Sequence, residues 1–155
     1  MHSRIFQVSA NPISKEDYIS ECKYDENLVN GIADYVVTVS EPLEDLKWLQ
    51  SVNRGLEVNF EEKTITITSK KEYFERSYEE FQKKLEELQQ ATIDDFITTK
   101  NHFQMYDLQE SYNSKRGFYI DDNDEYMGLN TLDAWVREAE ENKKYYIGRV
   151  FDYHF

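Results

Sequence analysis

The clearest pattern along the chain is a strict alternation of apolar and polar residues between positions 56 and 68. Two runs share this pattern on either side of a polar turn, and their apolar positions are Leu56, Val58, Phe60, Ile65 and Ile67. A period of two puts alternate side chains on opposite faces of a strand. The pattern therefore predicts a hairpin of strands near 56–60 and 63–68, with one apolar face and one face in water.

Three other short segments, 4–9, 118–120 and 145–155, are rich in aliphatic and aromatic residues and are predicted to be strands. In the last of them the odd-numbered positions are apolar, apart from Arg149. An aromatic strand at this end of the chain indicates that the end is held in the same sheet as the first strand.

Spacings of three and four between apolar residues predict the longest helix, over about 70–90. Ser69 and Glu72 form a capping box at its start, and its apolar face consists of Phe74, Tyr78, Phe81, Leu85 and Leu88. We expect this face to pack on the apolar face of the hairpin. The alternative is a coiled-coil dimer, for which the seam covers barely two heptads.

Weaker patterns predict helices over about 15–22, 42–51 and 93–112, and one more helix that Thr131 caps. The segment 28–36 also has helical spacing, which a following β-branched run weakens. The helix over 93–112 has apolar residues on two faces, which indicates that it is sandwiched between other elements. These residues are Phe96, Phe103, Tyr106, Met105, Leu108 and Tyr112.

Strands and helices do not alternate regularly along the 155 residues. This order favours an α+β fold, in which a mainly antiparallel sheet carries helices on one face. The length is typical of one domain and no stretch has the composition of a linker. We therefore expect residues 1–155 to form a single domain.

Acidic residues outnumber basic residues by 31 to 18, which gives a net charge of −13. Residues 1–62 hold 12 acids and 5 bases and residues 121–155 hold 9 and 4, whereas residues 63–120 hold 10 and 9. No cluster of Lys and Arg is available to neutralise phosphates, so we expect no direct binding to nucleic acid or to an anionic membrane. If the charge is functional, the two acidic ends should converge on one face.

The single cysteine, Cys22, cannot form an internal disulfide and is expected to be a half-buried apolar residue. The first residues lack the apolar run of a signal peptide. No segment is long and apolar enough to span a bilayer. These features favour a cytoplasmic protein.

The densest group of carboxylates is the acidic run at 121–125. Neither register of this run matches an EF-hand calcium loop, because the turn glycine and the closing glutamate are missing. The sequence therefore predicts an acidic loop in solvent and no metal site.

The three histidines, His2, His102 and His154, have no metal-binding spacing. Asp152 and His154 would share one face of a regular strand and form a carboxylate–histidine pair. The sequence contains none of the common nucleotide-binding or hydrolase motifs. We therefore predict no cofactor and no catalytic residue.

These observations favour a small acidic protein-interaction module that binds a basic protein, because negative charge speeds such an encounter. The predicted binding surface is the acidic loop and its apolar neighbours: Asp121, Asp122, Asp124, Glu125, Tyr126 and Met127. In size and charge alone, the chain resembles inhibitors, immunity proteins and DNA mimics of phages and mobile elements that act on nucleic-acid-handling proteins. The alternatives are an enzyme of unfamiliar type that uses Asp152 and His154, and a non-catalytic subunit of a larger complex.

Overall fold

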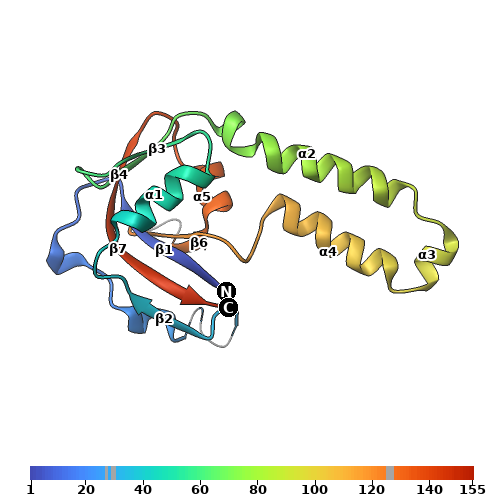
Figure 1. Ribbon diagram of the computed structural model, residues 1–155, viewed down its shortest axis with the longest axis horizontal. Coiled ribbons are helices and arrows are strands. Elements are labelled where there is room, and N and C mark those ends of the chain that lie inside the picture. The colour runs from blue at the N-terminus through green and yellow to red at the C-terminus, as the bar shows by residue number, and fades with distance from the viewer. Residues whose placement is uncertain (27, 29–30, 125–127) are drawn as a thin grey trace.

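The computed structural model describes residues 1–26, 28, 31–124 and 128–155, and it shows a sheet from which a pair of helices projects (Figure 1). The seven strands of these described residues are β1 (His2–Ser9), β2 (Tyr35–Thr38), β3 (Leu56–Asn59), β4 (Thr64–Ile67), β5 (Tyr119–Asp122), β6 (Gly128–Thr131) and β7 (Lys144–His154). Their α-helices are α1 (Leu43–Val52), α2 (Lys70–Gln89), α3 (Ile93–Ile97), α4 (Lys100–Tyr112) and α5 (Leu132–Glu138). Two 3-10 turns, η1 (Lys15–Asp17) and η2 (Glu21–Tyr24), precede β2.

The sheet is mixed. Its strand order is β3-β4-β7-β1-β5-β6, and β2 pairs with the last residues of β7. β1 and β5 run parallel, whereas the other paired strands are antiparallel. Strands that pair in parallel need a long connection, which the chain from residue 10 to residue 118 provides. The α+β class is therefore confirmed, and the expectation of a mainly antiparallel sheet is corrected.

Both faces of the sheet are covered, because neighbouring residues of a strand point to opposite sides. Phe6 and Val8 of β1 belong to a core beneath α1 and α5, to which these helices contribute Leu46, Leu49, Leu132, Trp135 and Val136. Ile5 points into a second core on the other face, together with Tyr24 and Leu28. Helices α1 and α5 thus lie on one face, as expected, and the segment before β2 covers the other.

An irregularity in the pairing of β1 with β7 changes the direction in which β7 points its side chains. The register shifts between Phe6 and Val8. On one side of the shift, Ile147 belongs to the core beneath α1 and α5, whereas on the other side Phe151 and Tyr153 belong to the second core. An extra residue in one strand has this effect because side chains alternate with a period of two. The odd-numbered residues of β7 therefore do not form one continuous inner face.

Gln7 is fully buried beside this irregularity and uses both ends of its amide. Its Oε1 accepts hydrogen bonds from the backbone N–H groups of Ile19 and Arg149, at 3.2 and 3.1 Å. Its Nε2 donates to the backbone carbonyl of Asp17 at 2.8 Å. A Cβ atom on Gly148 would lie 2.7 Å from the same amide oxygen. The glycine therefore leaves the space that the buried amide occupies.

Several local predictions need correction. The segment 15–22 forms two 3-10 turns in place of one helix, and Cys22 is exposed there rather than half-buried. The helix suggested by the spacing over 28–36 does not form in its described part: residues 31–34 are not helical and Tyr35 begins strand β2, whose β-branched residues favour an extended backbone, while residues 29 and 30 lie outside the described residues. The helix over 93–112 is divided at Thr98, whose backbone is extended. Strand β6 lies where the sequence predicts no strand.

Helices α2, α3 and α4 form an arm that projects from the sheet (Figure 1). α2 and α4 lie side by side along the arm, and the short α3 stands at its far end. No residue of α2 that the structure describes is buried, and Tyr78 of its apolar face is 61% exposed. The prediction that this helix packs on the hairpin is wrong, since only Tyr73 and Phe74 of its first turns reach the core.

The root of the arm is fastened to α5 by hydrogen bonds. The Tyr73 hydroxyl donates to Asp133 Oδ1 at 2.7 Å, and Lys70 Nζ donates to the backbone carbonyl of Arg137 at 2.6 Å. Burial, with the neighbouring Asp133, raises the pKa of Tyr73 well above its ordinary range, so its hydroxyl stays a donor. The first turns of α2 are therefore fixed, while the rest of the helix extends away from the sheet.

Gly55 allows α2 to begin close to the hairpin. Its φ angle is +71°, and a Cβ atom at this position would lie 2.2 Å from the backbone oxygen of Ser69. The Gly55 carbonyl also accepts a hydrogen bond from the Ser69 N–H at 3.2 Å. Only glycine combines this backbone conformation with so close an approach.

Candidate interaction surface

The acidic residues that the sequence singles out do not form one exposed loop. Asp121 and Asp122 are the last residues of β5, and both are buried. Asp124 is exposed, and its Oδ2 accepts a hydrogen bond from the N–H of Ala10 at 2.9 Å. The other predicted residues lie outside the described residues: Glu125, Tyr126 and Met127. The expectation of an acidic loop in solvent is therefore wrong for Asp121 and Asp122.

Asp121 is fully buried because η2 supplies two partners for its carboxylate. Lys23 Nζ lies 2.8 and 2.7 Å from the two carboxylate oxygens, and the Tyr24 hydroxyl donates to Oδ2 at 2.9 Å. Burial, with the neighbouring carboxylate, raises the pKa of Tyr24 far above its ordinary range. Asp121 is thus an internal counter-ion that fastens η2 to the sheet.

Asp122 points to the opposite face of the sheet. Its Oδ2 accepts a hydrogen bond from Trp135 Nε1 at 3.0 Å, and its Oδ1 accepts one from the N–H of Asp124 at 2.9 Å. Burial raises the pKa of this carboxyl group despite the two hydrogen bonds. Asp122 therefore connects β5 to α5.

The carboxylate–histidine pair expected on β7 does not form. His154 Nδ1 lies 2.8 Å from Asp34 Oδ2, on the turn before β2. Asp152 instead contacts His2 Nδ1 at 2.9 Å and Arg4 Nη1 at 2.5 Å, both on β1. Each group thus joins β7 to a different neighbour, and the prediction of an Asp152–His154 pair is wrong.

The most exposed apolar side chains of the arm lie at its tip. In α3, Ile93 is 71% exposed, Phe96 is 75% exposed and Ile97 is 74% exposed. Residues three and four positions apart lie on the same side of a helix. A capping box between Thr92 and Asp95 fixes the start of this helix. The tip therefore presents three large apolar side chains together.

Helix α4 turns apolar residues outward and shelters polar ones. Asn101 is only 9% exposed, and its amide donates to Gln104 Oε1 at 2.8 Å. In contrast, Phe103, Met105 and Tyr106 are 61%, 54% and 47% exposed. The expectation that this helix is sandwiched between other elements is therefore not met within the described chain. We use the term arm surface for six residues: Ile93, Phe96, Ile97, Phe103, Met105 and Tyr106.

Carboxylates flank the tip of the arm. The segment 86–97 contains four acidic residues and no Lys or Arg. Asp95 is paired with Lys100 at 3.0 Å. Among the described residues, the other three acids form no ion pair: Glu86, Glu87 and Asp94. Lys83, shortly before this segment, also forms no ion pair within the described structure. The unpaired charges near the tip are therefore three carboxylates and one ammonium group, and their sum is negative.

Part of the negative charge near the paired first and last strands is matched inside the fold. Arg4 lies between Asp45 and Asp152, with 2.5 Å to a carboxylate oxygen of each. Lys144 of β7 pairs with Glu62 at 2.5 Å. These carboxylates are therefore already engaged with cations of the same chain.

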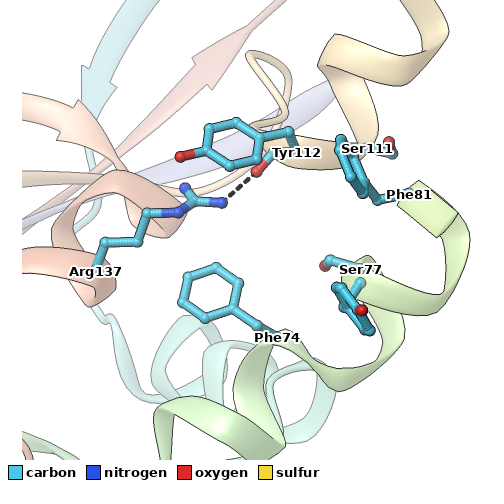
Figure 2. Close-up of a pocket in the computed structure, with 7 residues that line it drawn as sticks. Phe74, Ser77, Phe81, Ser111, Tyr112 and Arg137 are labelled. Atoms are coloured by element: carbon cyan, nitrogen blue, oxygen red, sulfur yellow. Dashed lines mark hydrogen bonds between the residues drawn. The ribbon is translucent and has the colours of Figure 1, made fainter. Parts of the chain in front are cut away.

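A cavity of about 300 Å³ lies at the root of the arm, where α2, α4 and α5 meet (Figure 2). Its walls are mainly aromatic, and the residues that line it are Phe74, Ser77, Tyr78, Phe81, Ser111, Tyr112 and Arg137. Arg137 is the one charged residue among these described lining residues. None of the seven belongs to the arm surface, so the cavity is a separate feature.

Sequence reasoning recognised the apolar residues of α3 and α4 but assigned them to burial. The sequence did contain a sign of their exposure: apolar residues lie on two faces of one predicted helix. Burying both faces requires more packing elements than the rest of the chain supplies. Arg137 carried no comparable signal, because its contacts with Phe74 and Tyr112 join positions far apart in the sequence.

No helix in the described ranges is long and apolar enough to cross a membrane. The same residues contain no group of three or more His, Cys, Asp or Glu side chains placed to hold a metal ion. Comparison of the chain with protein-family models, curated proteins and solved structures finds no match. Function is therefore inferred from the arm surface and the cavity themselves.

Proposed function

We propose that the protein is a protein-interaction module whose arm surface binds a basic partner protein. The exposure of Ile93, Phe96 and Ile97 at the tip of the arm supports this proposal most strongly. Full burial of such a side chain stabilises a complex by about 1.5–3 kcal/mol. In the free chain these side chains are exposed and contribute no such burial energy. Folded chains seldom expose large apolar patches unless a partner covers them.

The position of these residues suits insertion into a groove. The arm carries them away from the sheet (Figure 1), so a partner can contact the tip without meeting the rest of the molecule. Apolar residues on one side of a helix are a common means of binding in a hydrophobic groove. Large apolar side chains near the centre of such a contact usually contribute most of the affinity.

Charge selects the class of partner. Two copies of a chain with a net charge of −13 repel each other, whereas a protein with a basic rim is attracted. The unpaired carboxylates of Glu86, Glu87 and Asp94 flank the tip and would face that rim. Nucleic-acid-handling proteins present basic clefts, so the specific role that we propose is inhibition or neutralisation of such a protein.

Photo-crosslinking in the native host tests this proposal. One variant carries benzoylphenylalanine in place of Phe96, and a control carries it in place of Phe60, which is 38% exposed on the hairpin. We expect a basic protein to be crosslinked from position 96 and not from position 60. Crosslinks from position 96 only to a second copy of this chain, or the same products from both positions, would contradict the proposal.

A further inference from the structure

Two histidines face each other where the first and last strands of the sheet meet. His2 of β1 lies directly opposite His154 of β7 in the antiparallel register. The next backbone contact, from the Phe155 N–H to the Met1 carbonyl at 2.8 Å, makes the histidines a non-hydrogen-bonded pair. Side chains of such a pair approach each other closely, and the centroids of the two imidazole rings are 4.9 Å apart. The fold thus brings together two side chains that bind metals but lie at opposite ends of the sequence.

The separation of the two rings suits two ligands of one metal ion. Zn²⁺ binds imidazole nitrogen at about 2.0–2.1 Å in a tetrahedral arrangement, which places the centres of two bound rings roughly 5 Å apart. An ion can reach both side chains, since His2 is exposed and His154 is half-buried. Among divalent ions, imidazole favours zinc, copper and nickel over magnesium and calcium.

A carboxylate holds the Nδ1 atom of each ring. His154 Nδ1 lies 2.8 Å from Asp34 Oδ2, and His2 Nδ1 lies 2.9 Å from Asp152 Oδ2. Because a carboxylate accepts a hydrogen bond, the proton of each neutral ring belongs on Nδ1, which leaves the lone pair on Nε2. Histidines that bind a metal are almost always oriented by such a contact. Arg4 also contacts Asp152, so the negative charge that remains beside the rings is that of Asp34.

The Nε2 atoms are open to a cation. His154 Nε2 lies 3.3 Å from the exposed Met1 amino group, a contact in which the ring nitrogen is the acceptor and which an ion can displace. Within the described residues, His2 Nε2 forms no hydrogen bond. In contrast, the described residues that line the cavity at the root of the arm present almost no polar surface, so that cavity offers no comparable ligands.

We propose that His2 and His154 bind one Zn²⁺ ion through their Nε2 atoms, with water completing the coordination. Structural and catalytic zinc sites have three or four protein ligands, so a site with two is exchangeable. The ion joins β1 to β7 and stabilises the folded chain by mass action. The proposal is independent of the partner-binding role of the arm, because neither histidine belongs to the arm surface.

Calorimetric titration of the untagged chain with Zn²⁺ tests this inference, and we expect one ion per chain. His154→Gln removes a ligand and should weaken binding at least about tenfold, because even the loss of a group that only orients a metal ligand costs about 10–100-fold. His102→Gln is the matched control, since it removes an exposed histidine of the arm and should bind Zn²⁺ like the wild type. Equal affinities of the two variants, or one ion per two chains, would overturn the proposal.

Imidazole ¹⁵N resonances of the wild-type chain give a second readout that needs no variant to fold. Zn²⁺ should shift the Nε2 signals of His2 and His154 together and leave that of His102 unchanged. Asp34→Ala removes the carboxylate that orients His154 and should weaken binding by about 10–100-fold. Equal shifts of all three histidines, or no shift of the pair, would overturn the proposal.

Discussion

The carboxylate of Asp121 is shielded from water, and its partners explain how the fold accommodates it. An unpaired carboxylate in apolar surroundings is strongly unfavourable, but Lys23 and Tyr24 direct three hydrogen-bonding contacts to this group. The Lys23 side chain remains 42% exposed, so the ion pair is partly screened by solvent. The Tyr24 hydroxyl is buried and would lose its hydrogen-bond partner without Asp121, whereas the exposed Lys23 ammonium group could be solvated by water.

Replacement of Asp121 by alanine should lower the free energy of unfolding by about 1–3 kcal/mol, the cost of leaving a buried hydroxyl without a partner. Asp25→Ala removes an exposed acid that directly follows η2 and should change the free energy of unfolding by less than about 0.5 kcal/mol. Chemical denaturation measures both values. Equal effects of the two substitutions would show that Asp121 is not an internal counter-ion.

The sequence alone could not place these acids. Asp121 and Asp122 belong to a run of acidic residues, which normally indicates a solvated turn. Their burial depends on contacts with Lys23 and Tyr24 of η2 and with Trp135 of α5, two elements outside the acidic run. No local pattern of residues contains that information.

At the scale of elements, helix α2 was predictable but its packing partner was not. Spacings of three and four specify a helix with an apolar face, and that helix is confirmed over Lys70–Gln89. The apolar face of the hairpin was expected to cover this face, because the seam is too short for a coiled coil. Leu46 and Leu49 of α1, however, already share the core with Leu56 and Val58 of the hairpin. The apolar face of α2 therefore lies along α4 instead.

Phe81 gives a quantitative test of this packing. Its ring lies 6.4 Å from that of Tyr112, between their centroids, and its side chain is only partly buried. Phe81→Ala should therefore cost about 1–2 kcal/mol, less than the roughly 3–5 kcal/mol typical of a fully buried phenylalanine. Denaturation measures this loss, and a value in the higher range would place α2 against a core rather than in an exposed arm.

The start of α3 should respond to acid. Hydrogen bonds from the Thr92 backbone and from Lys100 lower the pKa of Asp95 below its ordinary value of 3.8. A lowered pKa means that the charged form stabilises the fold above pH 3.8 and that this contribution is lost as pH falls through the folded-state pKa. NMR titration of the Asp95 carboxyl carbon should give a midpoint below 3.8. A midpoint at or above that value would mean that the capping box does not hold in solution.

At the scale of the whole molecule, the arm carries the exposed apolar residues of the arm surface away from the sheet (Figure 1). The net charge of −13 acts over longer distances than these apolar contacts do, so it affects the rate of encounter with a basic protein. Charge composition predicted this class of partner, whereas only the three-dimensional arrangement shows that the exposed apolar residues belong to the arm.

Removing charge at the tip should slow association with the crosslinked partner more than it speeds dissociation. The tip variant combines Glu86→Gln, Glu87→Gln and Asp94→Asn. A control with the same change in net charge, made on exposed acids outside the arm, combines Glu41→Gln, Glu57→Gln and Glu61→Gln. Stopped-flow kinetics should show a several-fold lower association rate for the tip variant alone at low salt, and the difference should shrink near 1 M salt, where the Debye length is about 3 Å. Equal rates for the two variants would mean that total charge, not its position, governs the encounter.

The most direct test of the central claim is the affinity of the crosslinked partner for the Phe96→Asp variant. We predict binding at least about 30-fold weaker than that of the wild type, which corresponds to the roughly 2 kcal/mol that defines a binding hot spot. Leu43→Asp, at an exposed apolar position of α1 outside the arm, should retain wild-type affinity. Wild-type affinity in a folded Phe96→Asp variant would contradict the claim that the arm surface binds the partner.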